Sequence, residues 1–266
     1  MFADAYEKVT RFTRPVVVSS RTGDGKVTSG LAAFVVLNED GWFATAAHVL
    51  STWMAWREDR EKIARQAEKG GKVNRKFITN HSFWWGWDGI NLAEVHVRQE
   101  SDLAIGRLEP FEPGIVAEFP VVKDPESLRP GTSLCRLGFP FHELKTQWDE
   151  QAGQFQLPDG ALPAPLFPIE GIFTRQVRVE GSILPRFIET SSPGLQGQSG
   201  GPVFDTQGRV WGIQSRTHHL NLGFSPQLKI AGRQVTEHQF LNVGLAVHPS
   251  ELIDLANEKD IRLSVR

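Results

Sequence analysis

A serine in the second half of the chain stands in a segment whose residue types suit nucleophilic chemistry. Residues 194–202 have the sequence Gly-Leu-Gln-Gly-Gln-Ser-Gly-Gly-Pro, and an apolar stretch begins at Val203. A nucleophilic serine needs a tight turn that exposes its hydroxyl, and backbone N–H groups that converge where an oxyanion forms. We therefore interpret Ser199 as a nucleophile, with the N–H groups of Gly197 and Ser199 as the oxyanion hole. The alternative is that the glycines only form a turn before a strand.

A histidine and an aspartate earlier in the chain could complete this chemistry. His48 follows an apolar stretch among small residues, which leave room for its ring, and Asp102 opens another apolar stretch. If Asp102 accepts the Nδ1 proton of His48, it fixes the tautomer that leaves Nε2 free to take the Ser199 proton. Each residue alone has an ordinary explanation, as a core or rim histidine or as a turn-capping aspartate. The order His48, Asp102, Ser199, each in a suitable context, favours a catalytic triad.

The composition is that of an ordinary globular protein without a dominant charge. Of 266 residues, 40% are hydrophobic and 23% are charged, and the formal net charge is −2. No overall field therefore attracts nucleic acid or an anionic membrane. Cys135 is the single cysteine, so no internal disulfide can form. Residues 1–8 carry charges, whereas a secretory signal needs an apolar stretch there. The longest apolar run, 31–37, is too short to span a membrane. We expect a cytoplasmic protein without a membrane anchor.

Short apolar or alternating stretches dominate the rest of the sequence and predict β-strands in two groups. Helices are predicted at 51–69, which ends at two glycines, and from about 248, where Pro249 suits a first helical turn. The predicted fold class is all-β, with paired antiparallel barrels or a sandwich. The predicted strands are 15–18, 31–37, 42–46, 92–97 and 103–108 in the first group, and 133–137, 172–179, 183–189, 210–215 and 240–247 in the second.

The sequence resembles trypsin-like serine peptidases of the chymotrypsin fold, most closely the peptidase domain of the HtrA/Deg group. The resemblance is carried by a histidine block, an aspartate block and a serine block. These read Thr-Ala-Ala-His at 45–48, Ser-Asp-Leu-Ala at 101–104 and Gly-Gln-Ser-Gly-Gly-Pro at 197–202. The resemblance covers about 14–247 and implies two antiparallel six-stranded β-barrels, with an inserted surface helix and a C-terminal helix.

The resemblance also implies an organisation and an activity. Residues 1–266 would form a single peptidase unit, with a first barrel at 14–110 that includes a helical insert at 51–90, a second barrel at 118–248, and a C-terminal helix at 249–260. The implied activity is that of a serine endopeptidase, which cleaves peptide bonds through the triad and an acyl-enzyme intermediate. The alternative is a catalytically silent trypsin-like fold that acts as a binding or regulatory module, since placement to within about half an ångström decides competence.

Some features depart from the family pattern. Gln198 stands where secreted trypsins carry the aspartate that pairs with a newly cut N-terminus, so we do not expect activation by such cleavage. Little chain follows the second barrel, so the peptide-binding module that HtrA proteins usually append is not expected.

The segment 51–90 is longer than the family usually has between the histidine and the aspartate. It holds the aromatic cluster 83–87, which is either a docking patch or packing for the predicted helix.

The wall of the substrate pocket, by the same resemblance, lies shortly before the nucleophile and on the strand that follows it. No acid stands before the nucleophile to pair with a substrate lysine or arginine, so we expect a preference for a small or apolar side chain. A second hypothesis is that Arg216, His218 and His219 attract an acidic side chain. The predicted pocket residues are Ser192, Pro193, Gln196, Ser215, Arg216 and Thr217.

Other chemistries lack their motifs in this sequence. It contains no phosphate-binding loop, no His-Glu-x-x-His zinc motif and no paired Cys-x-x-Cys. We therefore expect no cofactor and no metal. The expected partner is a protein or peptide substrate, with no nucleic acid and no membrane, and the involvement of an activating protein partner is left open.

Overall fold

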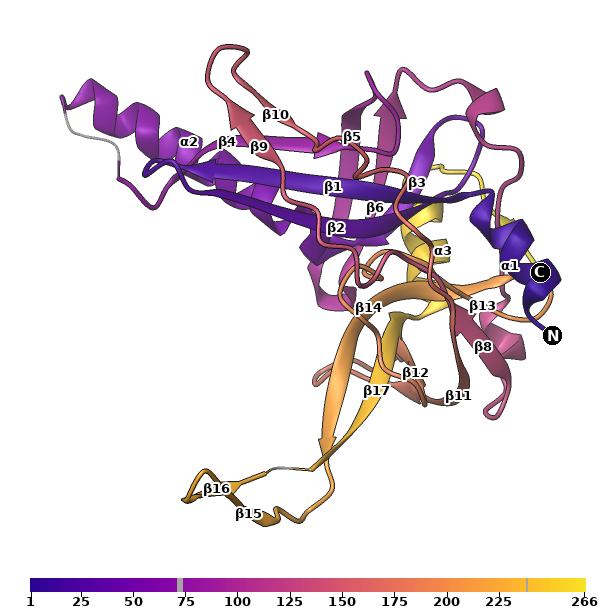
Figure 1. The fold of residues 1–266 in the computed structure, drawn as a ribbon. Coiled ribbons are helices and arrows are strands. Elements are labelled where there is room, and N and C mark those ends of the chain that lie inside the picture. Colours follow the sequence, from indigo (N-terminus) through magenta and orange to yellow (C-terminus); the bar gives the residue numbers. More distant parts are fainter. Residues whose placement is uncertain (71–73, 238) are drawn as a thin grey trace.

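Two β-sheets carry most of the chain in the computed structural model, which describes residues 1–70, 74–237 and 239–266 (Figure 1). The first sheet is formed by the N-terminal part of the chain and the second by the C-terminal part. The sequence-based prediction of an all-β fold with a surface helix and a C-terminal helix is confirmed. Of the two predicted six-stranded antiparallel barrels, the second is a closed ring of strands, whereas the first, in the described chain, is a six-stranded sheet whose two edge strands do not pair with each other. Both chain termini lie on the same side of the molecule, near helix α1 (Figure 1).

The first sheet has the strand order β4-β1-β2-β3-β6-β5, with every neighbouring pair antiparallel. In β2 the first residues alternate between exposed and half-buried, whereas 32–36 are all buried. That half of β2 has protein on both faces, which explains its unbroken run of apolar residues. The strands are β1 (Thr13–Thr22), β2 (Val27–Val36), β3 (Trp42–Ala46), β4 (Ile78–Trp84), β5 (Asn91–Arg98) and β6 (Leu103–Glu109).

The second sheet contains a ring of strands in the order β13-β8-β11-β12-β17-β14, which closes because β14 also pairs with β13. Two short strands, β7 and β18, extend the sheet beyond β14, and both of their pairings are parallel. The strands are β7 (Val121–Val122), β8 (Ser133–Arg136), β11 (Ile169–Val177), β12 (Phe187–Thr190), β13 (Pro202–Phe204), β14 (Val210–Asn221), β17 (Phe240–Val247) and β18 (Ser264–Val265).

The described part of the chain contains few helices. The longest, α2, coincides with the helix predicted at 51–69, and it buries no residue completely, as its many charges indicate. In the described part of the chain, no helix combines the length and apolar character needed to cross a membrane. The α-helices are α1 (Ala3–Thr10), α2 (Ser51–Glu68) and α3 (Pro249–Glu258), and the 3-10 helices are η1 (Ala47–Leu50), η2 (Gln99–Ser101), η3 (Pro113–Ile115) and η4 (Pro125–Ser127).

Two small hairpins that the sequence analysis did not predict extend from the sheets. Strands β9 (Gln147–Asp149) and β10 (Gln154–Gln156) form one, and β15 (Gln227–Ile230) and β16 (Arg233–Thr236) form the other, which projects from the ends of β14 and β17 (Figure 1). The segment 51–90, predicted as a helical insert, contains α2 and then β4. Because β4 pairs with β1, the last part of that segment belongs to the first sheet.

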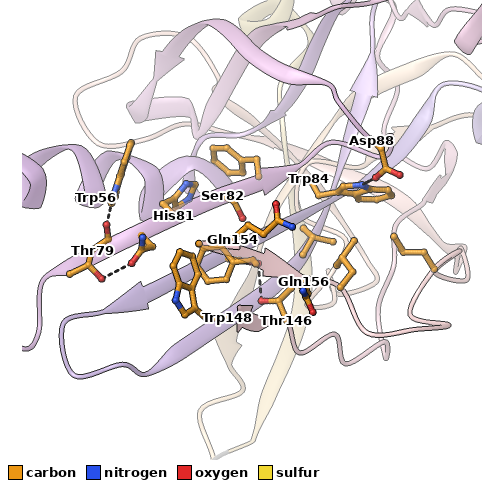
Figure 2. A pocket seen from close by; sticks show the side chains of 18 residues that line it. Trp56, Thr79, His81, Ser82, Trp84, Asp88, Thr146, Trp148, Gln154 and Gln156 are labelled. Atoms are coloured by element: carbon orange, nitrogen blue, oxygen red, sulfur yellow. Dashed lines mark hydrogen bonds between the residues drawn. The ribbon is translucent and has the colours of Figure 1, made fainter. Parts of the chain in front are cut away.

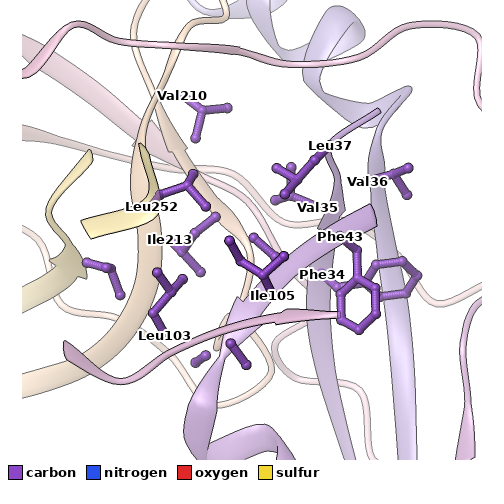
Figure 3. Packing of buried hydrophobic residues seen from close by; sticks show 14 of the residues in the cluster. Phe34, Val35, Val36, Leu37, Phe43, Leu103, Ile105, Val210, Ile213 and Leu252 are labelled. Carbon is purple, nitrogen blue, oxygen red and sulfur yellow. The ribbon is translucent and has the colours of Figure 1, made fainter. Parts of the chain in front are cut away.

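The main hydrophobic core joins the two sheets. Phe34 and Phe43 of the first sheet meet edge to face, with ring centroids 5.3 Å apart. The same cluster includes Ile105 of β6, Ile213 of β14 and Leu252 of α3 (Figure 3). Since one continuous cluster receives side chains from both sheets and from α3, their relative positions are held by apolar burial. The packing of this cluster places β3 beside β14, where the candidate site lies.

A buried carboxylate ties α3 to both sheets. The side chain of Glu251 is only 8% exposed, and it accepts hydrogen bonds from Arg98 Nη1 at 3.3 Å and from Arg186 Nη1 at 2.9 Å. Arg98 ends β5 in the first sheet, and Arg186 precedes β12 in the second. Arg98 also bonds Glu258, whose side chain is 58% exposed. Removing the charge of Glu251 would leave two partly buried guanidinium groups without their shared partner.

We predict that Glu251→Gln lowers the free energy of unfolding by about 3 kcal/mol, because it breaks a buried ion pair on one side only. The measurement is equilibrium urea denaturation. Glu258→Gln is the matched control and should cost less than about 1 kcal/mol, since that pair is exposed to solvent. Equal losses for the two variants would contradict this role of Glu251.

Candidate active site

His48 and Asp102 are brought together by the pairing of β3 with β6. Ala46, the last residue of β3, lies opposite Leu103, the first residue of β6. His48 follows in η1, and Asp102 comes directly after η2. The Nδ1 of His48 lies 2.8 Å from Asp102 Oδ2, and the backbone N–H of His48 donates to Asp102 Oδ1 at 2.9 Å. Both carboxylate oxygens therefore contact His48.

Asp102 has a backbone conformation that few residue types adopt. Its φ of 54° lies in the left-handed region, which aspartate tolerates better than bulky or branched residues do. Its backbone carbonyl accepts a hydrogen bond from the N–H of Ala47 at 2.9 Å. The main chain and the side chain of Asp102 thus both hold the segment that carries His48.

A serine of the second sheet completes the environment of Asp102. Ser215 of β14 donates its hydroxyl to Asp102 Oδ2 at 2.5 Å. The Asp102 side chain is only 13% exposed. Burial acts to raise the pKa of Asp102, but the hydrogen bonds and the nearby ring of His48, together with the bond from Ser215, outweigh it and lower that pKa below its usual value. Asp102 is therefore a carboxylate at neutral pH, and a carboxylate can only accept hydrogen bonds. The proton in the hydrogen bond between His48 and Asp102 therefore resides on Nδ1 of His48.

Ser199 lies between two consecutive tight turns. The N–H of Gln198 bonds the carbonyl of Leu195 at 3.0 Å, and the N–H of Gly201 bonds the carbonyl of Gln198 at 2.9 Å. The φ of Gly197 is 93°, and a Cβ there would lie 2.4 Å from the carbonyl oxygen of Phe139. Only glycine fits this position, as the sequence analysis inferred for the turn before the nucleophile.

The two predicted oxyanion donors are unoccupied in the loop. Of the residues that the structure describes, none accepts a hydrogen bond from the backbone N–H of Gly197 or of Ser199. The N–H groups around them are engaged: Gly200 donates to Gln214 at 2.8 Å, and Ala33 of the first sheet donates to the carbonyl of Ser199 at 2.8 Å. The loop is thus fixed by both sheets while two neighbouring donors remain available to an oxyanion.

His48 and Ser199 face a common cavity of about 300 Å³, which Gln196 and Gly197 also line. The side chain of His48 is 47% exposed. The hydroxyl of Ser199 donates to the carbonyl of Ser215 at 3.4 Å, and it makes no hydrogen bond with His48. The structure thus joins His48 to Asp102 directly, and places Ser199 in the same cavity as His48.

Gln198 stabilises the serine loop with neutral hydrogen bonds. Its side chain is fully buried, its Oε1 accepts from the N–H of Leu195 at 3.0 Å, and its Nε2 donates to the carbonyl of Phe167 at 3.3 Å. These two bonds tie the turn that carries Ser199 to Leu195 and Phe167, which both belong to the second half of the chain. Since no carboxylate stands at this position, the absence of activation by N-terminal cleavage stays a prediction.

The residues predicted to form the substrate pocket have different roles in the structure. Thr217 donates to the carbonyl of Gly194 at 2.5 Å, which links β14 to the segment before the serine loop. Arg216 is exposed, and its guanidinium lies 4.9 Å from the ring centroid of Phe187. Ser215 bonds Asp102, a contact that sequence reasoning missed because the two residues are 113 positions apart. Ser192 and Pro193, like the adjacent Gly194, stand just before the serine loop.

The aromatic cluster 83–87 contributes both to the core and to a groove. Trp85 is 1% exposed and packs against the rings of Phe34 and Phe43. Trp84 instead lines a groove of about 940 Å³ between β4 and the β9–β10 hairpin, where Trp148 also lies (Figure 2). The residues that line this groove do not include His48, Asp102 or Ser199. Trp85 therefore belongs to the core of the first sheet, and a docking role for the cluster stays a prediction.

Comparison with known proteins identifies the family. Residues 32–213 match the trypsin-like peptidase domain family, a segment that includes all three predicted triad residues. The chain therefore belongs to the trypsin-like peptidase family, as the three sequence blocks indicated. No curated protein sequence matches the chain.

Solved structures show the same fold at low sequence identity. AlgW, an HtrA-type protease solved with a tripeptide, matches 97% of this chain at 13% identity and a TM-score of 0.53. This chain spans 63% of the length of that protein. The Rv3671c protease from M. tuberculosis, in its active form, matches 98% of this chain and 86% of its own, at 16% identity and a TM-score of 0.53. The resemblance to the HtrA group is therefore a resemblance in fold.

We predict that Ser215→Ala destabilises the protein at neutral pH by about 1.5 kcal/mol, because it removes a hydrogen bond to a buried carboxylate. The pKa of Asp102 is lowered in the folded state, so this contribution is present above the unfolded pKa of about 4 and disappears as the pH falls through the folded value. Urea denaturation of both proteins from pH 7 to pH 3 measures the difference. A difference that stays constant over this range would contradict the prediction.

Proposed function

We propose that this member of the trypsin-like peptidase family is a serine endopeptidase in which Ser199 is the nucleophile, His48 the general base and Asp102 the residue that orients the histidine. The observation that carries the proposal is the combination of a His48 ring held at Nδ1 by Asp102 with two unoccupied backbone donors beside Ser199. The proposed substrate is a protein or peptide.

The proposed reaction begins at the hydroxyl of Ser199. As Oγ attacks the carbonyl carbon of the scissile peptide bond, Nε2 of His48 takes its proton, and Asp102 stabilises the imidazolium. The N–H groups of Gly197 and Ser199 donate to the oxyanion. His48 then gives the proton to the leaving amine, which departs and leaves an acyl group on Ser199. Water, deprotonated by His48, then attacks the acyl carbon. The bond between the acyl carbon and Ser199 Oγ breaks, and His48 returns the proton to Oγ.

The present hydrogen bond of Ser199 is compatible with this reaction. Its hydroxyl donates to Ser215 over 3.4 Å, which is long for an O–H···O bond and therefore weak. Exchanging this acceptor for Nε2 of His48 costs little, and an unliganded site often has catalytic hydrogen bonds that tighten only when substrate binds. The carbonyl of Ser215 thus serves as a resting acceptor for the nucleophile.

A fluorophosphonate probe tests the proposal, since it reacts rapidly only with an activated serine beside a formed oxyanion hole. We predict rapid labelling of the wild-type protein and its loss in Ser199→Ala and His48→Ala, measured by intact mass spectrometry. The exposed residues Ser127 and His218 supply matched controls, and Ser127→Ala and His218→Ala should label like the wild type. Absence of labelling in the wild type would favour the silent binding module instead.

A second prediction concerns the oxyanion donors. Gly197→Ala places a Cβ against the carbonyl of Phe139 and a side chain at a φ of 93°, so the turn must shift and the donor of residue 197 must move. We predict that the probe labels this variant at least about 100-fold more slowly, the usual cost of losing one oxyanion donor. Gly153→Ala, at an exposed glycine with free space around it, is the control. Wild-type labelling by Gly197→Ala would contradict the assigned oxyanion hole.

A further inference from the structure

Arg136 is a buried cation with incomplete hydrogen bonding. It ends β8 and is only 2% exposed. Its Nη2 donates to the hydroxyl of Thr190, whereas Nη1 is buried and has no hydrogen-bond partner. Burial lowers the pKa of Arg136 to about 10, which still leaves the guanidinium charged at neutral pH. The chain therefore buries a positive charge with an unused donor.

No carboxylate within residues 1–70, 74–237 and 239–266 forms an ion pair with Arg136. Glu189, next to Thr190 in β12, is bound instead by Arg175, with Nη2 and Oε2 2.8 Å apart. Asp205, the acid that follows β13, is bound by Arg209 at 2.8 Å and by the indole of Trp211 at 2.9 Å. A buried charge is costly unless it is paired. Among the described residues, Arg136 therefore has no carboxylate as its counter-ion.

The guanidinium contacts the strand that pairs with a predicted pocket residue of β14. A Cβ on Gly244 of β17 would lie 2.1 Å from Arg136 Nη1, so the guanidinium packs directly on that glycine. Gly244 pairs with Thr217 of β14, and Thr217 bonds the carbonyl of Gly194. Through Gly244 and Thr217, Arg136 is thus linked to the segment before Ser199.

The segment that leads to the serine loop contacts the same cluster. The hydroxyl of Thr190, which accepts from Arg136, is 3.3 Å from the carbonyl of Ser192 and 3.3 Å from that of Gly244. The hydroxyl of Ser192 is itself buried and has no hydrogen-bond partner in the described chain. Arg136 and Ser192, each with an unused buried donor, thus both contact the hydroxyl of Thr190.

We propose that Arg136 forms the floor of the substrate pocket and binds the carboxylate of an aspartate or glutamate side chain at the residue before the scissile bond. This inference rests on the proposed peptidase function and names its substrate class. A guanidinium matches a carboxylate geometrically, and the hydroxyl of Ser192 supplies a second donor. The preference for small or apolar residues expected from the sequence is replaced by a preference for acidic ones. Its source is Arg136 rather than Arg216, which is exposed above Phe187.

The test uses tetrapeptide aminocoumarins that differ only at the residue before the cleaved bond, with Asp, Glu, Asn, Gln, Val or Lys there. For the wild-type protein we expect kcat/KM to be at least about 100-fold higher with Asp or Glu than with the matching amide, because the amide leaves the buried cation unpaired. If Val or Gln is cleaved as fast as Glu, the inference is wrong, and the peptidase proposal stands because cleavage occurs.

Variants of the cation identify its source. Arg136→Gln should abolish the preference for Glu over Gln, Arg136→Lys should retain part of it, and Arg216→Gln, the matched control, should retain all of it. Loss of the preference in Arg216→Gln alone would assign the charge to Arg216 and overturn the inference. Reaction with the fluorophosphonate shows that a variant has a formed site, and Arg136→Lys keeps the test informative if Arg136→Gln does not fold.

A binding measurement separates this inference from the proposed function. Ser199→Ala protein is titrated by calorimetry with two product-like peptides that are identical except for a C-terminal Glu or Gln. Both peptides carry the same terminal carboxylate, so a difference reports the side chain alone. We expect the Glu peptide to bind at least about 10-fold more tightly, and Arg136→Gln to remove the difference. Equal binding of the two peptides would overturn the inference whether or not the chain is a peptidase.

Discussion

The buried carboxylate of Asp102 is the interaction on which the candidate site depends. It receives the ring and the backbone N–H of His48 from the first sheet and the hydroxyl of Ser215 from the second. A carboxylate so little exposed is tolerated because these donors more than compensate for burial, which is why its pKa is lowered. The same bonds fix the orientation of His48 and keep β14 beside the end of β3. The orientation of His48 and the docking of the two sheets therefore depend on one charged group.

The serine loop depends on the same junction between the sheets. The carbonyl of Ser199 accepts a hydrogen bond from the N–H of Ala33 in β2. The N–H of Gly200 donates to the carbonyl of Gln214 in β14. The continuous core of Phe34, Ile105 and Ile213 holds those strands together, so the positions of the oxyanion donors follow from apolar packing. The preference for one substrate side chain over another, in contrast, is expected to depend on buried polar atoms that have no hydrogen-bond partner within the described part of the protein.

The sequence predicted the fold class, both main helices and the candidate triad, because these depend on local signals: apolar periodicity, a glycine stop and a glycine-framed serine. It did not predict β4, whose residues are all half-buried and therefore lack the alternation of a one-sided strand. The bond between Ser215 and Asp102 and the burial of Arg136 depend on contacts between distant segments. A charged residue in an apolar stretch predicts exposure unless its tertiary surroundings are known.

The account requires that Asp102 hold a proton on Nδ1 of His48 and leave Nε2 free, and nitrogen-15 NMR of labelled histidine measures this most directly. At neutral pH we predict that the His48 signals show a protonated Nδ1 and an unprotonated Nε2, and that the Nδ1 proton is strongly shifted downfield by the carboxylate. The opposite tautomer, with the proton on Nε2, would contradict the account, because His48 could then not accept a proton from Ser199.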